Sequence, residues 1–529
     1  MAGQLPAGPA GQLTPAGRDA WPGPVAGLVA ALVALATGEV VAGLHERLTS
    51  PVVDVGDLII DRVPMPVASE AIDWFGTSDK AVLVVGIVFT CALLGAVLGT
   101  WADRRPGAAA AAFGAFALVG AFAAARQPEA APLSFLPSAA AAAAGAASLV
   151  GLRRAARAAP EPVPGAVPGS VPGAEGRRAF LALAGAGVVS AAALAAGGRW
   201  LQGRTSAVAS RLAVRLPRPV RPAPPVPPGA LLEVDGVAPL ITPTSDFYRI
   251  DTALVLPQVR AEDWSLRVTG MVDRELELSF DDLLARPLVE EVVTLACVSN
   301  PVGGDLVGTA RWLGAPLADL LREAGVRPDA DQVVGRSVDG FTAGFPLAAA
   351  LDGRPALVVV GMNGEPLPIR HGFPARLLVP GLYGYVSATK WLREIELTRF
   401  DQFDAYWIRR GWAREGPIKL MARIDTPGGR VRPRPGPVTV AGVAWAPTVG
   451  VARVEVRVDD GPWVDAELAD PVNDLTWRQW RYVWTATPGR HRLAVRATGS
   501  DGRVQPEHDG DPFPSGAGGW HVVSVRVEG

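Results

Sequence analysis

A single cysteine ends an apolar run in the middle of the chain. Residues 294–300 read Thr-Leu-Ala-Cys-Val-Ser-Asn, so Cys297 is followed at once by the strand-ending residues Ser299 and Asn300. Glycines at 303, 304 and 308 would let a bulky group approach the backbone. A lone cysteine is by default a packing residue, but a bond to a metal would deprotonate the thiol and protect it from oxidation. We therefore expect Cys297 to be a metal ligand at the rim of a pocket.

A second polar stretch lies further along the chain. Residues 371–380 read His-Gly-Phe-Pro-Ala-Arg-Leu-Leu-Val-Pro, and Lys390-Trp391 follow shortly after. Histidine, arginine and lysine side chains can fix a phosphate-bearing cofactor. The alternative is that His371 and Arg376 are solvated charges at a strand end, which the Gly-Phe-Pro between them makes less attractive. We interpret the two stretches as two halves of one metal-cofactor site.

Four ordered motifs carry a resemblance to a known family. They are Thr-Leu-x-Cys-Val-x-Asn at 294–300, Ala-Arg-Trp-x-Gly with Leu-x-Asp-Leu-Leu at 310–321, His-Gly-Phe-Pro-x-Arg-Leu-Leu-Val-Pro at 371–380, and Lys-Trp-Leu at 390–392. Together they resemble the sulfite oxidase family of molybdopterin enzymes, in its membrane-anchored bacterial form without a haem domain. The resemblance covers residues 231–529.

The resemblance implies a molybdenum atom held by one pterin dithiolene, two oxygen ligands and the Cys297 thiolate. It implies catalytic roles for Cys297, Arg249 and Tyr406, although Tyr406 could instead be a core residue. The implied cofactor-binding residues are Ser245, Tyr248, Arg249, Ser337, His371, Arg376, Ser387, Thr389 and Lys390. The chain departs from true sulfite oxidases at Pro301-Val302, where those enzymes carry paired arginines. The departure removes positive charge from the expected pocket and weakens the case for sulfite as substrate.

Charge and histidine content restrict the partners. The net charge of −2 gives no bulk attraction to nucleic acid. Of the five histidines only His45 lies near the apolar segments, so we expect no built-in cytochrome b haem with two histidine ligands. We expect a small-molecule substrate, a membrane and an external electron carrier as partners. The family's C-terminal dimerisation domain adds a homodimer to these expectations.

The first 200 residues are rich in Ala, Gly, Val and Leu and predict an all-α transmembrane bundle. After a disordered tail at 1–22, a transmembrane region at 23–152 holds four apolar runs long enough to cross a bilayer. These runs are 24–44, 81–101, 107–125 and 133–152. The last two could instead be buried helices of a soluble protein.

A flexible linker at 153–176 leads to a fifth apolar segment at 177–200. The sequence Arg177-Arg178-Ala-Phe-Leu before this segment is similar to a twin-arginine export signal. The alternative is an ordinary fifth span with positive flanks. With the N-terminus inside, the predicted inner segments carry Arg18, Arg104, Arg105, Arg153, Arg154, Arg157, Arg177 and Arg178. The outer loops carry Arg47, Arg62, Lys80 and Arg126. This excess of inner positive charge places everything after residue 200 outside the cytoplasm of a bacterial cell.

The remainder predicts three further parts. Residues 201–230 contain seven prolines between 217 and 228 and predict an extended stalk. Residues 231–435 mix strands and short helices without a βαβ repeat, which predicts an α+β domain. Residues 436–529 show strict strand alternation with a hairpin turn at Asp459-Asp460-Gly461, which predicts an immunoglobulin-like β-sandwich.

We therefore expect a multidomain, multi-pass membrane protein with an extracytoplasmic molybdenum oxidoreductase. Its reaction would be a two-electron oxygen-atom transfer on a small substrate, of the sulfite oxidation or the sulfoxide reduction type. The alternative is a non-catalytic membrane receptor whose β-sandwich binds a partner. Molybdenum content separates the two.

Overall fold

The computed structural model describes residues 22–45, 48–64, 67, 70–71, 74–75, 78–102, 105–127, 130–157, 174–204, 207–428, 431–508 and 510–529. The chain forms two compact units, Met1–Thr205 and Ser206–Gly529. The predicted tail at 1–22, apart from Pro22, and residues 158–173 of the predicted linker lie outside the described residues. So do Arg18, Arg47 and Arg104 of the orientation argument.

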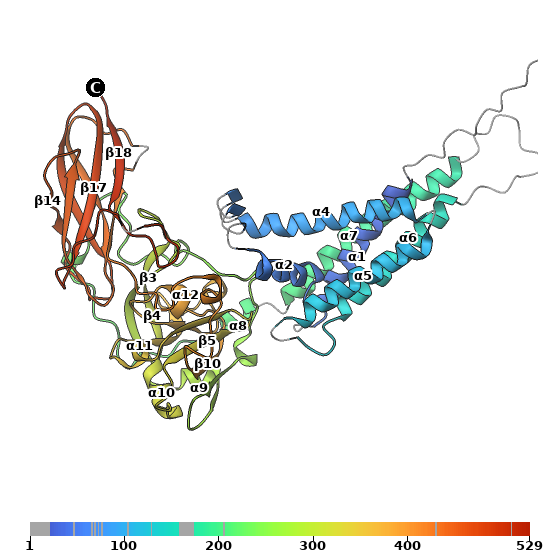
Figure 1. The fold of residues 1–529 in the computed structure, drawn as a ribbon, viewed down its shortest axis with the longest axis horizontal. Coiled ribbons are helices and arrows are strands. Elements are labelled where there is room, and N and C mark those ends of the chain that lie inside the picture. Colours follow the sequence, from blue (N-terminus) through green and yellow to red (C-terminus); the bar gives the residue numbers. More distant parts are fainter. Residues whose placement is uncertain are drawn as a thin grey trace, which may run out of the picture. The chain divides into compact units, whose positions relative to one another are not determined.

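The first unit is helical (Figure 1). Its helices are α1 (Pro22–Ala42), α2 (Pro51–Arg62), α4 (Asp79–Trp101), α5 (Pro106–Ala125), α6 (Leu136–Arg157) and α7 (Ala174–Arg204). Four segments of the described residues are long and apolar enough to cross a membrane: Pro22–Ala42, Asp79–Trp101, Gly107–Ala125 and Arg178–Leu201. Helix α6 forms where a fourth span was predicted but is not among these four, and it ends in Arg153, Arg154 and Arg157.

Helices α1 and α4 approach closely because glycines face each other. A Cβ atom added to Gly27 would lie 1.8 Å from the carbonyl oxygen of Gly95, and one added to Gly99 would lie 2.0 Å from that of Gly23. Small residues at such positions allow the two backbones to touch. Helix α2, which the sequence did not predict, begins at Ser50, whose hydroxyl accepts a hydrogen bond from the Val52 amide.

The second unit begins with two sheets and short helices. One sheet has the order β2-β1-β10-β5-β6, and the other has the order β3-β4-β7-β8 with β9 paired to β7. Strands β1 and β10 are parallel, and the other strand pairs of these two sheets are antiparallel. The strands are β1 (Ser265–Gly270), β2 (Leu276–Ser279), β3 (Val289–Ala296), β4 (Val307–Pro316), β5 (Gln332–Ser337), β6 (Thr342–Pro346), β7 (Leu357–Met362), β8 (Glu365–Pro366), β9 (Arg376–Leu378) and β10 (Leu392–Thr398).

Several short helices connect these strands. They are α8 (Ala207–Ala213), α9 (Phe280–Leu284), α10 (Leu317–Ala324), α11 (Ala348–Leu351) and α12 (Gly384–Ser387), with 3-10 turns η2 (Pro228–Ala230), η3 (Ala261–Asp263), η4 (Ile369–His371) and η5 (Ile408–Arg410). Ser279 caps α9, since its hydroxyl accepts from the Asp282 amide. Gly325 ends α10, with a positive φ of 71°.

The proline-rich segment is not the predicted free stalk. Its backbone pairs with the start of β3: the Val220 amide donates to the Leu288 carbonyl at 2.8 Å, and the Glu290 amide donates to the Arg221 carbonyl at 2.9 Å. Leu216 and Val226 pack on the hydrophobic core. The segment lies along the start of β3 because prolines favour an extended chain, which can pair beside a strand.

The C-terminal part consists of two four-stranded sheets, ordered β11-β12-β16-β15 and β14-β13-β17-β18. The strands are β11 (Met421–Thr426), β12 (Gly436–Trp445), β13 (Val451–Val458), β14 (Val464–Asp465), β15 (Glu467–Leu468), β16 (Arg478–Ala486), β17 (Gly489–Gly499) and β18 (His521–Val527). Side chains from both sheets form one core that includes Val440, Trp480 and Val495. The first sheet starts with β11, before the predicted boundary at residue 436. The immunoglobulin-like class itself stays a prediction.

The C-terminal part supports the strand that carries the cysteine. The Thr294 amide of β3 donates to the Leu475 carbonyl at 2.9 Å, and the Thr294 hydroxyl accepts from the Trp477 amide at 2.7 Å. Asn473 donates to the Val292 carbonyl at 3.1 Å. Thr294 is buried, so these bonds are shielded from water. The segment before β16 thus fixes the strand that ends at Cys297.

Candidate functional site

Cys297 lies directly after β3 and is buried. Its backbone amide donates to the Leu306 carbonyl at 2.9 Å, and its sulfur lies 3.0 Å from the Ser299 hydroxyl. Burial raises the pKa of the Cys297 thiol, while the Ser299 hydrogen bonds and the positive charge of Lys390 act in the opposite direction. A buried thiol of this kind becomes a thiolate when a cation such as a metal is bound to it.

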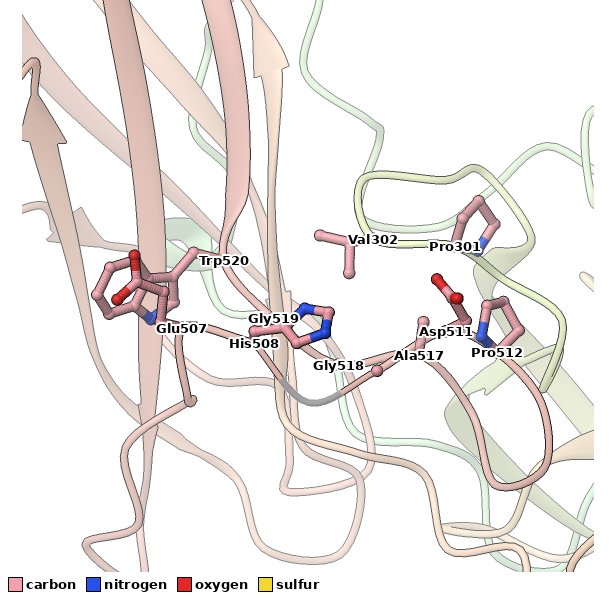
Figure 2. A pocket seen from close by; sticks show the side chains of 11 residues that line it. Pro301, Val302, Glu507, His508, Asp511, Pro512, Ala517, Gly518, Gly519 and Trp520 are labelled. Atoms are coloured by element: carbon pink, nitrogen blue, oxygen red, sulfur yellow. The ribbon is translucent and has the colours of Figure 1, made fainter.

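The loop after Cys297 borders a pocket of about 260 Å³ (Figure 2). Pro301 and Val302 line one side of this pocket, and a segment before β18 lines the other. The lining residues from that segment are Glu507, His508, Gly510, Asp511, Pro512, Ala517, Gly518, Gly519 and Trp520. The described lining includes two carboxylates but neither Lys nor Arg. The pocket therefore offers little attraction to an anion.

His371 comes from the turn η4 and has 1% of its surface exposed. Its Nε2 atom is buried without a hydrogen-bond partner among the described residues. Burial lowers the pKa of His371 to about 3, and the charges of Arg376, Arg370 and Lys390 add to this effect. A neutral imidazole with an unsatisfied buried nitrogen indicates a missing hydrogen-bond partner at this position.

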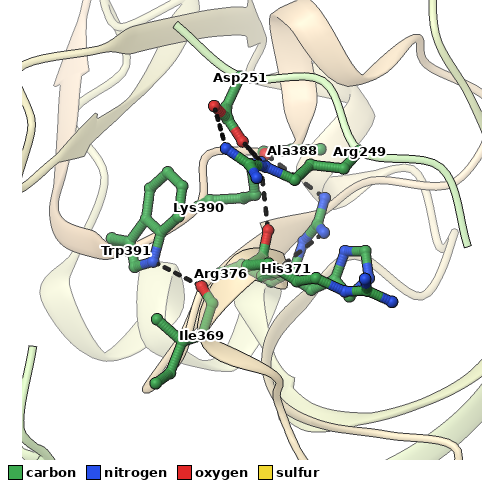
Figure 3. Close-up of polar contacts among 9 residues, drawn as sticks. Arg249, Asp251, Ile369, His371, Arg376, Ala388, Lys390 and Trp391 are labelled. Atoms are coloured by element: carbon green, nitrogen blue, oxygen red, sulfur yellow. Dashed lines mark hydrogen bonds and ion pairs between the residues drawn. The ribbon is translucent and has the colours of Figure 1, made fainter. Parts of the chain in front are cut away.

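Arg376 begins β9 and lies beside His371 (Figure 3). Its guanidinium donates to the His371 carbonyl at 3.3 Å and stands 5.3 Å from the centre of the Trp312 ring. Burial lowers the pKa of Arg376 to about 10. Tyr248 belongs to the same neighbourhood: burial raises its pKa, and the charge of Cys297 adds to this while Arg376 opposes it. Tyr248 therefore lies within electrostatic range of both Cys297 and Arg376.

Lys390 follows α12 and completes the cationic cluster (Figure 3). Its ammonium group donates to the Asp251 carboxylate at 2.7 Å, and the Arg249 Nε donates to the same oxygen at 2.8 Å. Burial lowers the pKa of Lys390 to about 8, although Asp251 opposes this shift. Gly372 has a φ of +106°, and a Cβ there would meet the Lys390 backbone at 3.0 Å. Glycine at 372 therefore permits the turn that carries His371 to pack against Lys390.

The structure brings together five of the residues expected from the sequence: Cys297, Tyr248, His371, Arg376 and Lys390, with Arg249 joined through Asp251. Two other predicted residues form hydrogen bonds to residues near them in the sequence. Ser245 is exposed and donates to Asp246, and the buried Ser387 hydroxyl lies 3.0 Å from the Tyr383 carbonyl.

Three further predicted residues are held by their own surroundings. The Thr389 hydroxyl donates to the Gly335 carbonyl at 3.4 Å, and the Ser337 hydroxyl accepts from the Asp339 amide at 3.4 Å. Tyr406 is buried in an aromatic cluster, with its ring 5.7 Å from Phe341 and 5.1 Å from Trp407. This packing favours the alternative that Tyr406 is a core residue.

Sequence reasoning missed three charged residues of the site. Asp251 joins Lys390 to Arg249, and Arg370 donates to the Thr244 and Ser245 carbonyls at 2.7 and 2.6 Å. The buried Asp339 carboxylate has a pKa raised by burial and, in part, by Asp251. The positions of Asp251 beside Arg249 and of Arg370 beside His371 were the available signals in the sequence.

These residues fit a phosphate-bearing, metal-binding cofactor. The site has a buried thiol, an imidazole nitrogen in need of a partner, and a set of arginine and lysine side chains aimed at one region. Arginine and lysine bind phosphate through charge-assisted hydrogen bonds. The described residues contain no group of three or more His, Cys, Asp or Glu side chains that could hold a metal ion by themselves. The donor set thus fits a metal with one protein ligand and the rest supplied by a cofactor.

Comparisons with known proteins agree with this donor set. Residues 253–407 match the oxidoreductase molybdopterin binding domain. Mitochondrial sulfite oxidase from Mus musculus is 30% identical over 340 residues, which cover 54% of this chain and 62% of that protein. The uncharacterized oxidoreductase YuiH from Bacillus subtilis is 37% identical over 153 residues, which cover 29% of this chain and 74% of that protein.

One solved structure supports the same fold. The sulfane dehydrogenase SoxCD from Paracoccus pantotrophus aligns with a TM-score of 0.50 at 24% identity, covering 56% of this chain and 83% of that one.

The depressed pKa of His371 predicts an acid-sensitive fold. Its pKa of about 3 in the fold lies below its usual 6.5, so the unfolded chain binds a proton first as pH falls. The stability that the neutral His371 side chain contributes to the fold is fully present above pH 6.5 and is lost as the pH falls towards 3. In cofactor-free protein, His371→Gln should reduce the loss of unfolding free energy between about pH 7.5 and about pH 5 by roughly 2 kcal/mol. Urea unfolding at both pH values measures this.

His491→Gln is the matched control. A hydrogen bond to Asp459 holds the pKa of the half-buried His491 above its usual value, so the stability that His491 contributes is present at low pH and is lost as pH rises. Removing His491 should therefore change the pH dependence in the opposite direction. Equal pH profiles for wild type and His371→Gln would contradict the burial of a neutral His371.

Proposed function

Because the chain belongs to the sulfite oxidase family of molybdopterin-dependent oxidoreductases, we propose that residues 231–529 form an enzyme that moves an oxygen atom and two electrons between a small substrate and a molybdenum centre. The observation that carries the proposal is the meeting of a buried thiol, an unsatisfied imidazole and a cationic cluster in one site. The chain spans 62% of the mouse sulfite oxidase that it matches.

Cys297 would be the protein ligand of the metal, since its buried thiol requires a nearby cation to ionise. Arg376, Lys390 and Arg249 would bind the phosphate of the pterin, and His371 Nε2 would accept or donate its missing hydrogen bond there. When bound, the cofactor would supply the two-electron redox chemistry and the transferable oxygen. The protein would supply binding, orientation and exclusion of water. An external electron carrier and a homodimer through the C-terminal sheets complete the proposal.

Cys297→Ser should lower turnover by about 1000-fold or more, because a hydroxyl is a much poorer donor to a redox metal than a thiolate. Wild-type protein should contain about one molybdenum per chain by elemental analysis. Cys91→Ser is the control, since Cys91 lies in α4 and should leave both values unchanged. Full activity of Cys297→Ser would contradict the assignment. Wild-type protein without molybdenum or pterin would instead favour a non-catalytic binding protein.

We propose that the substrate carries less negative charge than sulfite. Pro301 and Val302 border the pocket beside the cysteine loop, and two carboxylates lie across from them. Arg249 is already paired with Asp251. Two other arginines are engaged with partners of their own: Arg414 binds Asp404 at 2.9 Å, and Arg478 donates to the Val451 carbonyl at 2.6 Å. A sulfoxide therefore fits this charge distribution better than a dianion.

Steady-state assays with an artificial electron carrier should show weak binding of sulfite, with a KM above about 1 mM and little dependence on salt. Methionine sulfoxide should give a lower KM than sulfite. Glu507→Gln with Asp511→Asn should lower the KM for sulfite, because these changes remove negative charge from the pocket. A sub-millimolar, strongly salt-sensitive KM for sulfite in wild type would contradict the charge argument.

We propose that the protein is a multi-pass membrane protein whose catalytic part lies outside the bacterial cytoplasm. Four described segments have the length and apolarity for this, and the arginine distribution favours this orientation. Arg177-Arg178 would act as a twin-arginine-type export signal, because a cofactor loaded in the cytoplasm requires export of a folded domain. The immunoglobulin-like class of the C-terminal sheets belongs to the same proposal.

Arg177→Lys with Arg178→Lys should keep residues 231–529 inside the cell and protected from added protease. Arg154→Lys with Arg157→Lys is the control, since it makes the same change in α6 and should leave exposure unchanged. Equal protease exposure of wild type and both double variants would show that Arg177 and Arg178 act only as flanking charges.

A further inference from the structure

Asp251 stands between two of the cations that the proposed cofactor would need. Its side chain is 4% exposed, and one carboxylate oxygen accepts from both Lys390 at 2.7 Å and Arg249 at 2.8 Å. The Lys390 side chain is 11% exposed. Figure 3 shows the three side chains converging above Arg376 and His371. The site therefore already contains an anion of its own.

The electrostatic free energy of Asp251 and its neighbouring cations would change when an oxyanion binds. The positive charges of Arg376 and Arg249 act against the charge of Lys390, and a buried cation such as Lys390 is costly unless it is paired. Asp251 offsets that repulsion when no ligand is present. A phosphate or sulfite group bound to the same cations would lie close to the Asp251 carboxylate, and like charges at such distances repel strongly in a poorly solvated site.

We propose that Asp251 is an internal counter-ion that competes with an oxyanion for Lys390 and Arg249, so that ligand binding breaks at least one of its two ion pairs. The inference rests on the proposed function for the identity of the oxyanion, which is either the cofactor's phosphate or an anionic substrate. It extends that function by assigning a role to a residue that the cofactor chemistry itself does not require.

Two consequences follow from this competition. Asp251 keeps the cations paired and in place in the unloaded protein, which stabilises that state. The same pairing weakens oxyanion binding, because the ligand must displace a carboxylate that is already bonded. Removal of the carboxylate should therefore destabilise the free protein and strengthen oxyanion binding at the same time, as linkage requires.

The test uses the full chain purified in detergent from cells unable to make the pterin. Thermal unfolding is followed with increasing inorganic phosphate, with sodium chloride at matched ionic strength as the reference. Asp251→Asn should unfold at a lower temperature than wild type without phosphate. Phosphate should raise its unfolding temperature with an apparent Kd roughly tenfold lower than in wild type, because the competing carboxylate is gone.

Two further variants make the result specific. Asp352→Asn removes a carboxylate from Arg354, with which it pairs at 2.7 Å outside the site, and should respond to phosphate as wild type does. Asp251→Glu retains the charge and should also respond as wild type does. Equal phosphate responses in wild type, Asp251→Asn and Asp352→Asn would overturn the proposal. So would an Asp251→Asn protein that stays unfolded in phosphate, since Asp251 would then be a structural residue only.

Cofactor-loaded protein identifies the source of the oxyanion. If loading with the cofactor abolishes the phosphate response of Asp251→Asn, the oxyanion beside Lys390 and Arg249 is the cofactor's own phosphate. A response that persists after loading and is competed by sulfite assigns it to an anionic substrate, and either result supports the competition. Wild-type protein that never contains molybdenum would reject the proposed function, whereas normal molybdenum content with equal phosphate responses would reject this inference alone.

Discussion

The burial of several cationic and polar groups around one point is the constraint on which the rest of the catalytic unit depends. His371 and Arg376 are almost fully buried, and Lys390 is nearly so. Their pKa values are all displaced downwards by burial. Such groups are costly to remove from water, so they persist only where partners compensate for the loss. Here the partners are Asp251, backbone carbonyls and the face of Trp312.

The surrounding fold provides rigid positions for these groups. Trp312 of β4 is fully buried and donates to the Val293 carbonyl of β3, so the platform under Arg376 is tied to the cysteine strand. Thr294 of that strand is bonded in turn to Leu475 and Trp477 of the C-terminal part. Arg423 of β11 donates to the Gly304 carbonyl at 2.7 Å and so holds the loop beyond Cys297. The C-terminal sheets therefore contribute to the geometry of the site.

Much of this organisation was predictable because local patterns and motifs dictate it. The apolar run before Cys297, the Ser279 cap and the Gly325 helix end are short-range features, and the structure has them. The cysteine and His371 motifs identified the two halves of the site and the family. The path of the proline-rich segment was not predictable, because its pairing with β3 depends on distant residues. Asp251 was missed for the same reason: its partner Lys390 is remote in sequence, and no local rule pairs them.

The central claim is that Cys297 binds molybdenum within a pterin site built from these buried cations. X-ray absorption at the molybdenum edge tests it most directly, because it counts the sulfur atoms bound to the metal. About three sulfur ligands are expected in wild-type protein, two from one dithiolene and one from Cys297, and about two in Cys297→Ser. An unchanged sulfur count in that variant, with the metal still bound, would contradict the account.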